Sequence, residues 1–375
     1  MAIKKVKILI AITTAIFTLV TLATIIYVNR NQDPYTSQAG PQLPDPPLKE
    51  LAERRGIEVG SFASLKYLRE RPYTDILSSE FNYLIIDGEP NWRFEDHTLR
   101  PSKDEFDFSD LDQVFDFADQ NDMPVRYQHM LWGDEKWLPD WLTTGNFSRN
   151  ELLAIIDNHI TTVGKKYQGR VREYTVVNEA FSRELQTGGN KDWWGIQLGR
   201  EYIDYAFISA KKADPTAVLI LNDFGNETEG EISNLMLDYI KSAKERGVPI
   251  DALGMQMHIS GTNAPSTEEV VSNMKRFKDI GVKIYITEFD VNMHDVPGTD
   301  EEKDDLQAKI YGDMLQACLD IGPETCSNFG FLGLIDRQSW YNGIGLDDAD
   351  PLLFRSDYTP KPAFFEVRST LLGNK

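Results

Sequence analysis

Two glutamates, Glu179 and Glu288, each follow a short apolar run with the composition of a buried β-strand. The runs read VVNE and YITE, so a charged side chain comes where the apolar pattern stops. Two further runs end in polar residues in the same way, at Asn222-Asp223 and at Gln256-Met257-His258. A single polar residue after a strand is typical of a cap for the next helix, but four such endings together indicate one shared site.

Two carboxylates that face each other across a cleft are the groups that cleave a glycosidic bond. One must be protonated to donate to the leaving oxygen, and the other must be ionised to attack or stabilise the anomeric carbon. Close, partly desolvated carboxylates differ in pKa because one charge opposes the other, and this difference separates the two roles. The pair Glu179 and Glu288 therefore predicts a glycoside hydrolase.

The elements that must position these residues are short β-branched or aliphatic runs, which alternate with longer segments of helical periodicity. Helices are expected at 108–120, 151–167 and 199–213, where apolar residues recur at three- and four-residue steps. Eight strands can be placed, at residues 57–62, 81–86, 124–129, 173–178, 218–222, 251–258, 283–289 and 328–336.

Eight strands with intervening helices predict a closed α/β barrel, the (β/α)8 or TIM barrel, as a single catalytic domain. In such a barrel the active site is built from the C-terminal ends of the strands, which is where the polar residues stand. A doubly wound open sheet is the alternative. It would bind a nucleotide, but the first strand is not followed by GxGxxG and the chain has no P-loop motif.

The composition agrees with one large folded domain. The chain has 375 residues, of which 41% are hydrophobic and 11% aromatic, enough for a sizeable core. Its formal net charge is −20, and no Lys/Arg run outside the extreme N-terminus could follow a phosphate backbone, so nucleic acid is not an expected partner. An acidic surface is compatible with a neutral polysaccharide or oligosaccharide substrate, although it does not select one.

The N-terminus carries Lys4, Lys5 and Lys7, followed by an uncharged apolar stretch over residues 8–28. These roughly 21 residues match the length that crosses a bilayer as a helix. We therefore expect a transmembrane anchor, or signal-anchor, over residues 1–29, with the membrane as a partner. Lysines before the span keep the N-terminus in the cytoplasm and the barrel outside the cell. Secretion after signal peptide cleavage is the alternative.

A proline-rich segment over residues 30–50 is expected to be a semi-extended linker, and residues 51–375 to form the barrel. The only cysteines are Cys318 and Cys326, and in an exported protein such a close pair favours a disulfide over a catalytic thiol. The five histidines form no HExxH motif, so neither a metal nor another cofactor is implied. We expect a monomer.

Over most of residues 57–366 the chain resembles glycoside hydrolase family 10, the endo-β-1,4-xylanases. The resemblance rests on these ordered segments: Phe81-Asn82 with Trp92, YTVVNEAF (174–181), LGREYIDYAF and KKADPTAVLILND (198–223), IDALGMQMHIS (250–260), IYITEFDV (284–291), DRQSW (336–340) and PLLFRSDYTPKPAF (351–364). It implies a retaining, endo-acting β-glycanase that hydrolyses β-1,4-linked polysaccharide of the xylan type.

The resemblance also implies a role for each matching residue. Glu179 matches the family's acid/base and Glu288 its nucleophile, and Asn178 matches the residue that binds the substrate 2-hydroxyl. His258 matches the imidazole that orients the nucleophile, although a histidine satisfied within the core is the alternative for it. The remaining matches are Gln256 and Asp290, near His258, and Trp340, an aromatic ring that lines the cleft.

Several sugar-binding positions depart from the family pattern. ENEMKW appears as residues 87–92, DGEPNW, and RGHTLVWHSQ appears as residues 126–135, RYQHMLWGDE. The gain of Gly88 and Gly133, with Leu332 in place of a tryptophan, is expected to widen the cleft before the cleavage point. A different or substituted β-glycan is therefore an alternative substrate, and an inactive sugar-binding relative is a further alternative. The candidate substrate-binding residues are Trp340, Trp132, Asp87, Asn91, Gln128 and Glu135.

Overall fold

The computed structural model describes residues 38–86, 88–94, 97–185 and 191–374. The expected anchor over residues 1–29 and the start of the linker lie outside these residues, as does Asp87. Within the described part of the chain, no helix is both long enough and apolar enough to cross a membrane.

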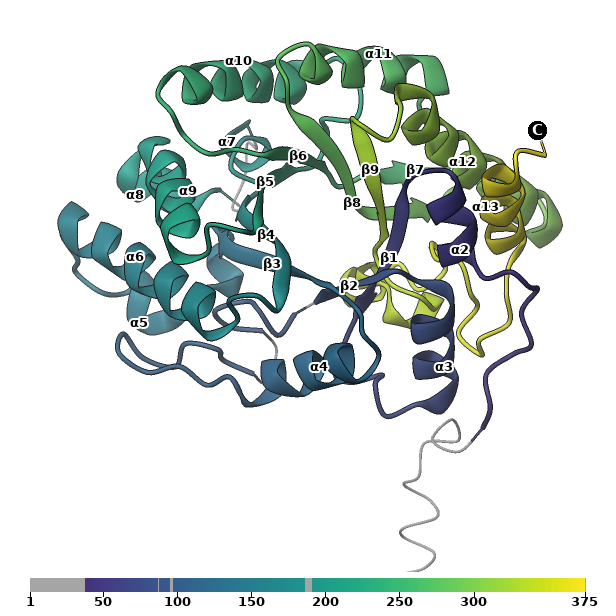
Figure 1. The fold of residues 1–375 in the computed structure, drawn as a ribbon, viewed down its shortest axis with the longest axis horizontal. Helices are drawn as coiled ribbons and strands as arrows, with labels where there is room; N and C mark the ends of the chain where they lie inside the picture. The colour runs from purple at the N-terminus through teal and green to yellow at the C-terminus, as the bar shows by residue number, and fades with distance from the viewer. Residues whose placement is uncertain (1–37, 87, 95–96, 186–190, 375) are drawn as a thin grey trace, which may run out of the picture.

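A closed ring of parallel strands forms the centre of the molecule, and the helices lie outside it (Figure 1). The strand order in the described chain is β6-β5-β4-β3-β2-β1-β9-β8-β7, and a further pairing of β6 with β8 closes the ring. The predicted (β/α)8 barrel is confirmed, because β6 and β7 together take one position in the ring. The strands are β1 (Glu58–Ala63), β2 (Tyr83–Ile86), β3 (Val125–Trp132), β4 (Val171–Asn178), β5 (Val218–Asp223), β6 (Ala252–Met255), β7 (His258–Ser260), β8 (Lys283–Asn292) and β9 (Cys326–Phe331).

The sixth predicted strand, 251–258, is broken into β6 and β7. The break falls at Gln256 and Met257, and Met257 has a φ of 62°, in the left-handed region. Such a conformation costs a residue other than glycine about 1–3 kcal/mol and is concentrated at functional sites. The chain then pairs again with β8, with His258 opposite Asp290. The apolar pattern of the segment did not reveal this break.

The three helices expected from the periodicity are confirmed as α4, α6 and α9, each beginning within two residues of its predicted start. Capping boxes begin α6, α11 and α12, where a serine or threonine bonds the backbone of a glutamate three residues later and the glutamate bonds back. The helices are α2 (Leu48–Arg54), α3 (Arg71–Glu80), α4 (Ser109–Gln120), α5 (Asp140–Thr143), α6 (Arg149–Lys166), α7 (Ser182–Leu185), α8 (Trp193–Leu198), α9 (Glu201–Ala213), α10 (Glu231–Glu245), α11 (Thr267–Lys278), α12 (Asp300–Ile321) and α13 (Pro362–Leu372), with short 3-10 turns at Glu135–Trp137, Asp336–Gln338 and Trp340–Ile344.

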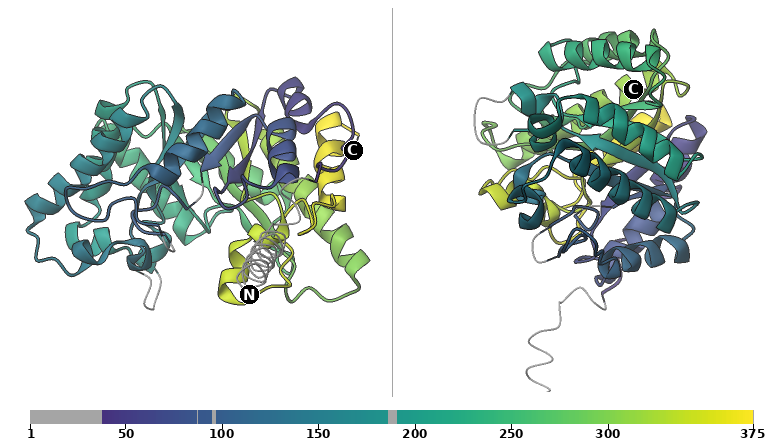
Figure 2. Two further views of the ribbon diagram at one scale, coloured as in Figure 1. Left: turned by 90° about the horizontal axis from the view of Figure 1, so that it is seen from below. Right: turned by 90° about the vertical axis from the view of Figure 1, so that its left-hand side faces the viewer.

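The segments that follow β8 and β9 lie side by side at one end of the barrel (Figure 2). Backbone N–H groups at the end of β8 and directly after it donate to carbonyls of the segment that follows β9, from Val291 to Pro351 at 3.2 Å and from Met293 to Ala349 at 2.8 Å. Because all the strands run in parallel toward this end, it is the C-terminal mouth of the barrel, where the active site of such a fold is expected.

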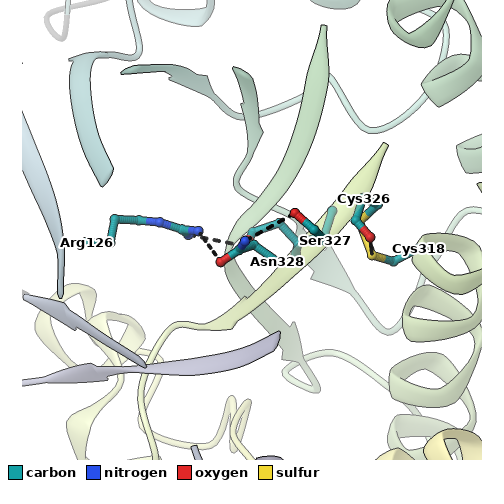
Figure 3. The surroundings of a disulfide bond; sticks show 6 residues. Arg126, Cys318, Cys326, Ser327 and Asn328 are labelled. Carbon is teal, nitrogen blue, oxygen red and sulfur yellow. Dashed lines mark hydrogen bonds between the residues drawn. A yellow bond between two sulfur atoms is a disulfide. The ribbon is translucent and has the colours of Figure 1, made fainter. Parts of the chain in front are cut away.

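The main hydrophobic core lies between the strands and the helices, whereas the inside of the ring holds a buried ion pair. Arg126 on β3 bonds Glu173 on β4 at 2.7 Å, and its guanidinium also reaches Asn328 on β9 across the ring at 3.4 Å (Figure 3). The rings of Tyr83 and Tyr285 lie within 5.4 Å of the same guanidinium. These contacts lie near the starts of β3 and β4, so they fill the ring at the end opposite the mouth.

The barrel begins earlier than predicted. Helix α2 starts at Leu48, inside the predicted linker over residues 30–50, and both Leu48 and Leu51 are buried. The backbone N–H of Leu48 donates to Glu80 at 2.8 Å, and Arg368 on α13 donates to the carbonyls of Asp45 and Pro46. The linker was predicted from its prolines. Because proline is tolerated immediately before a helix, these residues do not show where the chain starts to pack on the barrel.

A disulfide joins Cys318 on α12 to Cys326 at the start of β9, as predicted (Figure 3). Both residues are fully buried, and their Cα atoms are 5.3 Å apart. The bond ties an outer helix to the strand that follows it, and the sequence separation is only 8 residues. It is therefore a local link between two neighbouring elements of the barrel.

Replacing both cysteines, Cys318→Ser with Cys326→Ser, is expected to lower the free energy of unfolding by about 2–3 kcal/mol, because a short loop restricts the unfolded chain only modestly. Denaturant unfolding followed by tryptophan fluorescence measures the loss. In the unaltered protein, thiol titration after denaturation without reductant should find no free thiol, and two free thiols would contradict the bond.

Candidate active site

Glu179 stands at the mouth of the barrel, directly after Asn178, the last residue of β4. Its φ is 57°, in the left-handed region that glutamate rarely adopts. Its backbone N–H donates to the carbonyl of Asn222 on β5 at 2.9 Å. The chain therefore turns away from the barrel wall at Glu179 while this residue stays tied to the neighbouring strand, at a conformational cost of about 1–3 kcal/mol.

Glu288, within β8, is buried at the same mouth and is only 7% exposed. Its Oε1 accepts hydrogen bonds from Gln128 at 2.5 Å and from Asn222 at 2.8 Å. Its Oε2 lies 3.4 Å from Nε2 of His258. Groups from β3, β5 and β7 thus converge on one carboxylate and fix its position.

The electrostatic surroundings keep Glu288 charged. Burial by itself raises the pKa of this carboxyl, but the neighbouring imidazoles of His129 and His258 lower it by more, to about 2. The nearer contact of the two is with His258, because Nε2 of His129 lies 3.8 Å from Oε1 of Glu288. Glu288 is therefore ionised at any pH well above 2, which is the form that a nucleophile requires.

His258 lies between two carboxylates, with Nδ1 3.1 Å from Oδ1 of Asp290 and Nε2 facing Glu288. Burial lowers the pKa of His258, but Asp290 and Glu288 together raise it well above its usual value. Trp340 donates its indole N–H to the other oxygen of Asp290 at 3.0 Å. The Trp340 side chain is 45% exposed, so a flat apolar ring is available to the face of a sugar.

The carboxylate of Glu179 accepts hydrogen bonds from three donors. Oε2 accepts the indole N–H of Trp132 at 2.8 Å and the Nε–H of Arg183 at 2.5 Å. Oε1 accepts from Nε2 of Gln256 at 3.2 Å. Trp132 and Gln256 are neutral donors, whereas Arg183 brings a positive charge against this carboxylate. These three contacts fix the side chain of Glu179 at the mouth of the barrel.

A chain of three amides connects the two carboxylates. The NH2 group of Gln256 donates to Glu179 and also to Oδ1 of Asn178 at 3.1 Å. The NH2 group of Asn222 donates to the same Oδ1 at 2.8 Å and to Glu288. The NH2 group of Asn178 itself has no hydrogen-bond partner among the described residues, so it is available to a sugar hydroxyl between the two glutamates.

The structure brings together most of the residues predicted for the site, namely Glu179, Glu288, Asn178, His258, Gln256, Asp290, Trp340, Trp132 and Gln128. Two of those predicted to bind substrate instead bond a glutamate directly, Gln128 to Glu288 and Trp132 to Glu179. Within the described residues, no hydrogen bond joins Asn91 or Glu135 to this group; Asn91 is buried and Glu135 is exposed.

The widening expected from the two glycines is wrong at both positions. A Cβ atom added at Gly133 would lie 1.9 Å from Oδ1 of Asp192, and one added at Gly88 would lie 2.5 Å from the ring of Phe94. At each position, a different residue already occupies the space that a side chain in place of the glycine would need: Asp192 beside Gly133 and Phe94 beside Gly88. Neither substitution enlarges the cleft at its own position.

Two residues of the site, Arg183 and His129, were not predicted. A third, Asn222, was named only as the end of an apolar run, with no role assigned. Arg183 follows Glu179 by four residues, the spacing at which side chains meet across a helical turn, so it too had a signal in the sequence. His129 had none, because its distance from Glu288 depends on how β3 and β8 lie in the ring.

Comparison with protein families and curated proteins gives concordant similarities. The family model described as glycosyl hydrolase family 10 matches residues 47–370. The chain is 35% identical to endo-1,4-beta-xylanase B of Thermotoga neapolitana over 332 residues, covering 87% of this chain and 92% of that protein. It is 30% identical to endo-1,4-beta-xylanase of Agaricus bisporus over 320 residues, covering 84% and 92%.

Solved structures show the same relationship. Xylanase 10B of Thermotoga petrophila RKU-1, in complex with xylobiose, matches with a TM-score of 0.80 and 32% identity, covering 89% of this chain and 99% of that one. Native xylanase 10B of Thermotoga maritima matches with a TM-score of 0.79 and 33% identity, covering 88% and 98%. The similarity therefore extends over nearly nine tenths of this chain.

The charge on His258 is expected to set the acidic limit of activity. In the variant His258→Ala, the group that lowers the pKa of Glu288 at closest range is lost, so the carboxylate protonates at higher pH. The acidic limb of the kcat/KM profile should move up by roughly 1–3 pH units. The matched control is His294→Ala, which removes a partly exposed histidine bonded to Asp348. Equal profiles for both variants would contradict this role.

Proposed function

Since this chain belongs to glycosyl hydrolase family 10, we propose that it is a retaining, endo-acting hydrolase of β-1,4-linked polysaccharide of the xylan type. The observation that carries the proposal is the pairing of a buried, ionised Glu288 with Glu179 across a chain of amides. The relatives named above are endo-1,4-beta-xylanases, and one of the similar structures holds xylobiose.

In the first step, a carboxylate oxygen of Glu288 attacks the anomeric carbon and forms a covalent glycosyl ester. The bond from that carbon to the leaving oxygen breaks, and Glu179 supplies the proton that this oxygen takes up. Glu288 suits the attack because it is ionised, and Gln128 and Asn222 hold its Oε1 while Oε2 faces His258. Asp290 holds His258 in place, and His258 stabilises the negative charge of Glu288 until the carboxylate attacks.

In the second step, Glu179 acts as a base. It takes a proton from water, whose oxygen attacks the anomeric carbon and releases Glu288, so two displacements restore the original configuration. The three donors that contact the carboxylate of Glu179 suit this half of the cycle. The free NH2 group of Asn178 lies between the two glutamates, where a donor can bind the sugar hydroxyl next to the reacting carbon.

The full-length protein is expected to cut xylan internally, so that short oligosaccharides appear before xylose, and proton NMR should detect the β-anomer first. A 2-fluoro xylobioside should leave its sugar on the peptide that contains Glu288. Glu288→Ala should lower kcat by a factor on the order of 10⁴ or more, as removal of a nucleophile does. The exposed Glu324→Ala serves as the matched control.

The α-anomer as first product, or a label on a different residue, would overturn this mechanism. Activity on a β-glucan or a mannan but not on xylan would keep the mechanism and replace the substrate. These two outcomes are separable, because the label reports the nucleophile and the polymer screen reports the sugar.

We further propose that residues 1–29 tether the enzyme to the cell membrane, with the barrel outside. The proposal rests on the apolar stretch over residues 8–28 and on the lysines that precede it. The full-length protein should remain with membranes after a carbonate wash, and protease added to intact cells should digest the barrel. A mature soluble protein that begins near residue 30 would show instead that the segment is a cleaved signal peptide.

A further inference from the structure

Arg183 lies between the acid/base glutamate and a second carboxylate. Its Nε donates to Glu179 at 2.5 Å, and its Nη2 lies 3.2 Å from Oδ2 of Asp134. All three side chains are only 9% exposed. Asp134 is itself fixed, because its Oδ1 accepts the backbone N–H of Lys136 at 3.0 Å. One buried guanidinium therefore contacts two buried carboxylates at once.

This arrangement opposes the first chemical step. A guanidinium against a carboxylate favours the charged form, whereas Glu179 must be protonated before it can donate to the leaving oxygen. Trp132 and Gln256, the other partners of Glu179, are neutral, so Arg183 is the contact that opposes protonation most. Cleavage therefore requires that the positive charge of Arg183 move away from Glu179 once the substrate has bound.

We propose that Arg183 is a positioning residue that holds Glu179 as a carboxylate in the free enzyme and turns to Asp134 when polysaccharide binds. This inference rests on the proposed function, because it assigns a control to the acid/base of that reaction. The turn changes hydrogen-bond partners only. Glu179 takes its proton from solvent, and Arg183 keeps its own charge throughout.

The other ionisable groups around this pair support the choice of Asp134 as the receiving partner. Asp223 on β5 faces the segment after Glu179 and accepts the backbone N–H groups of Phe181 and Ser182, and Asp192 caps α8. Burial raises the pKa of each of these two, to about 7, so both are largely neutral under acidic conditions. Asp134 already touches Nη2 of Arg183, so a small rotation of the arginine side chain completes the transfer.

The pH dependence of two kinetic constants tests the inference. The profile of kcat/KM reports groups of the free enzyme, and the profile of kcat reports groups of the substrate complex. On xylo-oligosaccharides, whose leaving oxygen needs a proton, Arg183→Gln should move the alkaline limb of kcat/KM up by roughly one pH unit or more. The alkaline limb of kcat should stay in place, because in the complex Arg183 has already left Glu179.

A second variant addresses the receiving side. Asp134→Asn removes the negative charge that attracts Arg183, so Arg183 should remain on Glu179 after substrate binds and the alkaline limb of kcat should move down. A 2,4-dinitrophenyl xylobioside, whose leaving group needs no proton, should show neither shift in its glycosylation step.

Arg183→Lys keeps the charge and should restore the profile of the unaltered protein. Arg200→Gln is the matched control, because it removes a half-exposed arginine bonded to Glu184 of the same short helix, and its profile should not change. Identical kcat/KM profiles for Arg183→Gln and the unaltered protein would overturn the inference, and so would equal shifts in kcat and kcat/KM. An unaltered protein that does not hydrolyse xylo-oligosaccharides would instead refute the proposed function.

Discussion

The buried negative charge of Glu288 is the constraint on which the rest of the site depends. Moving a carboxylate out of water costs several kcal/mol, so a folded protein keeps it ionised only if donors and positive charge replace the lost water. Here Gln128, Asn222 and His258 provide that replacement, from three different strands. No single strand could supply these donors. The strands must therefore pair in the register that brings all three side chains to Glu288.

The two glutamates differ because their surroundings differ. Glu288 faces imidazoles and amides that are fixed within the barrel wall, which suits a group that must stay charged until it attacks. Glu179 faces the guanidinium of Arg183, carried by a short helix outside the strands. The backbone of Glu179 is in the left-handed region, and the arginine that contacts its carboxylate also has Asp134 within reach.

The inside of the barrel supports this mouth through polar contacts as well as apolar packing. Arg126 spans the ring from β3 to β9 and pairs with Glu173, so strands that are not neighbours are held at a set distance. Breaking such a pair on one side leaves an uncompensated buried charge, which is strongly destabilising. Strands β3 and β4 carry the ion pair at the base of the ring and also Gln128 and Asn178 at its mouth. The pairing of these strands at the base therefore also sets where the two site residues lie.

The sequence by itself determined the features that depend on local pattern. Alternating apolar runs and helical periodicity predicted the barrel, and the polar residues that end the runs predicted Glu179 and Glu288. It did not determine which side chains meet across the ring. Gln128 and Glu288 are 160 residues apart, and their contact exists only because strand register brings them together. The space beside Gly133, filled by Asp192, and the start of the barrel at Leu48 were likewise decided by tertiary packing, because the groups that fill a space come from segments whose position no local pattern encodes.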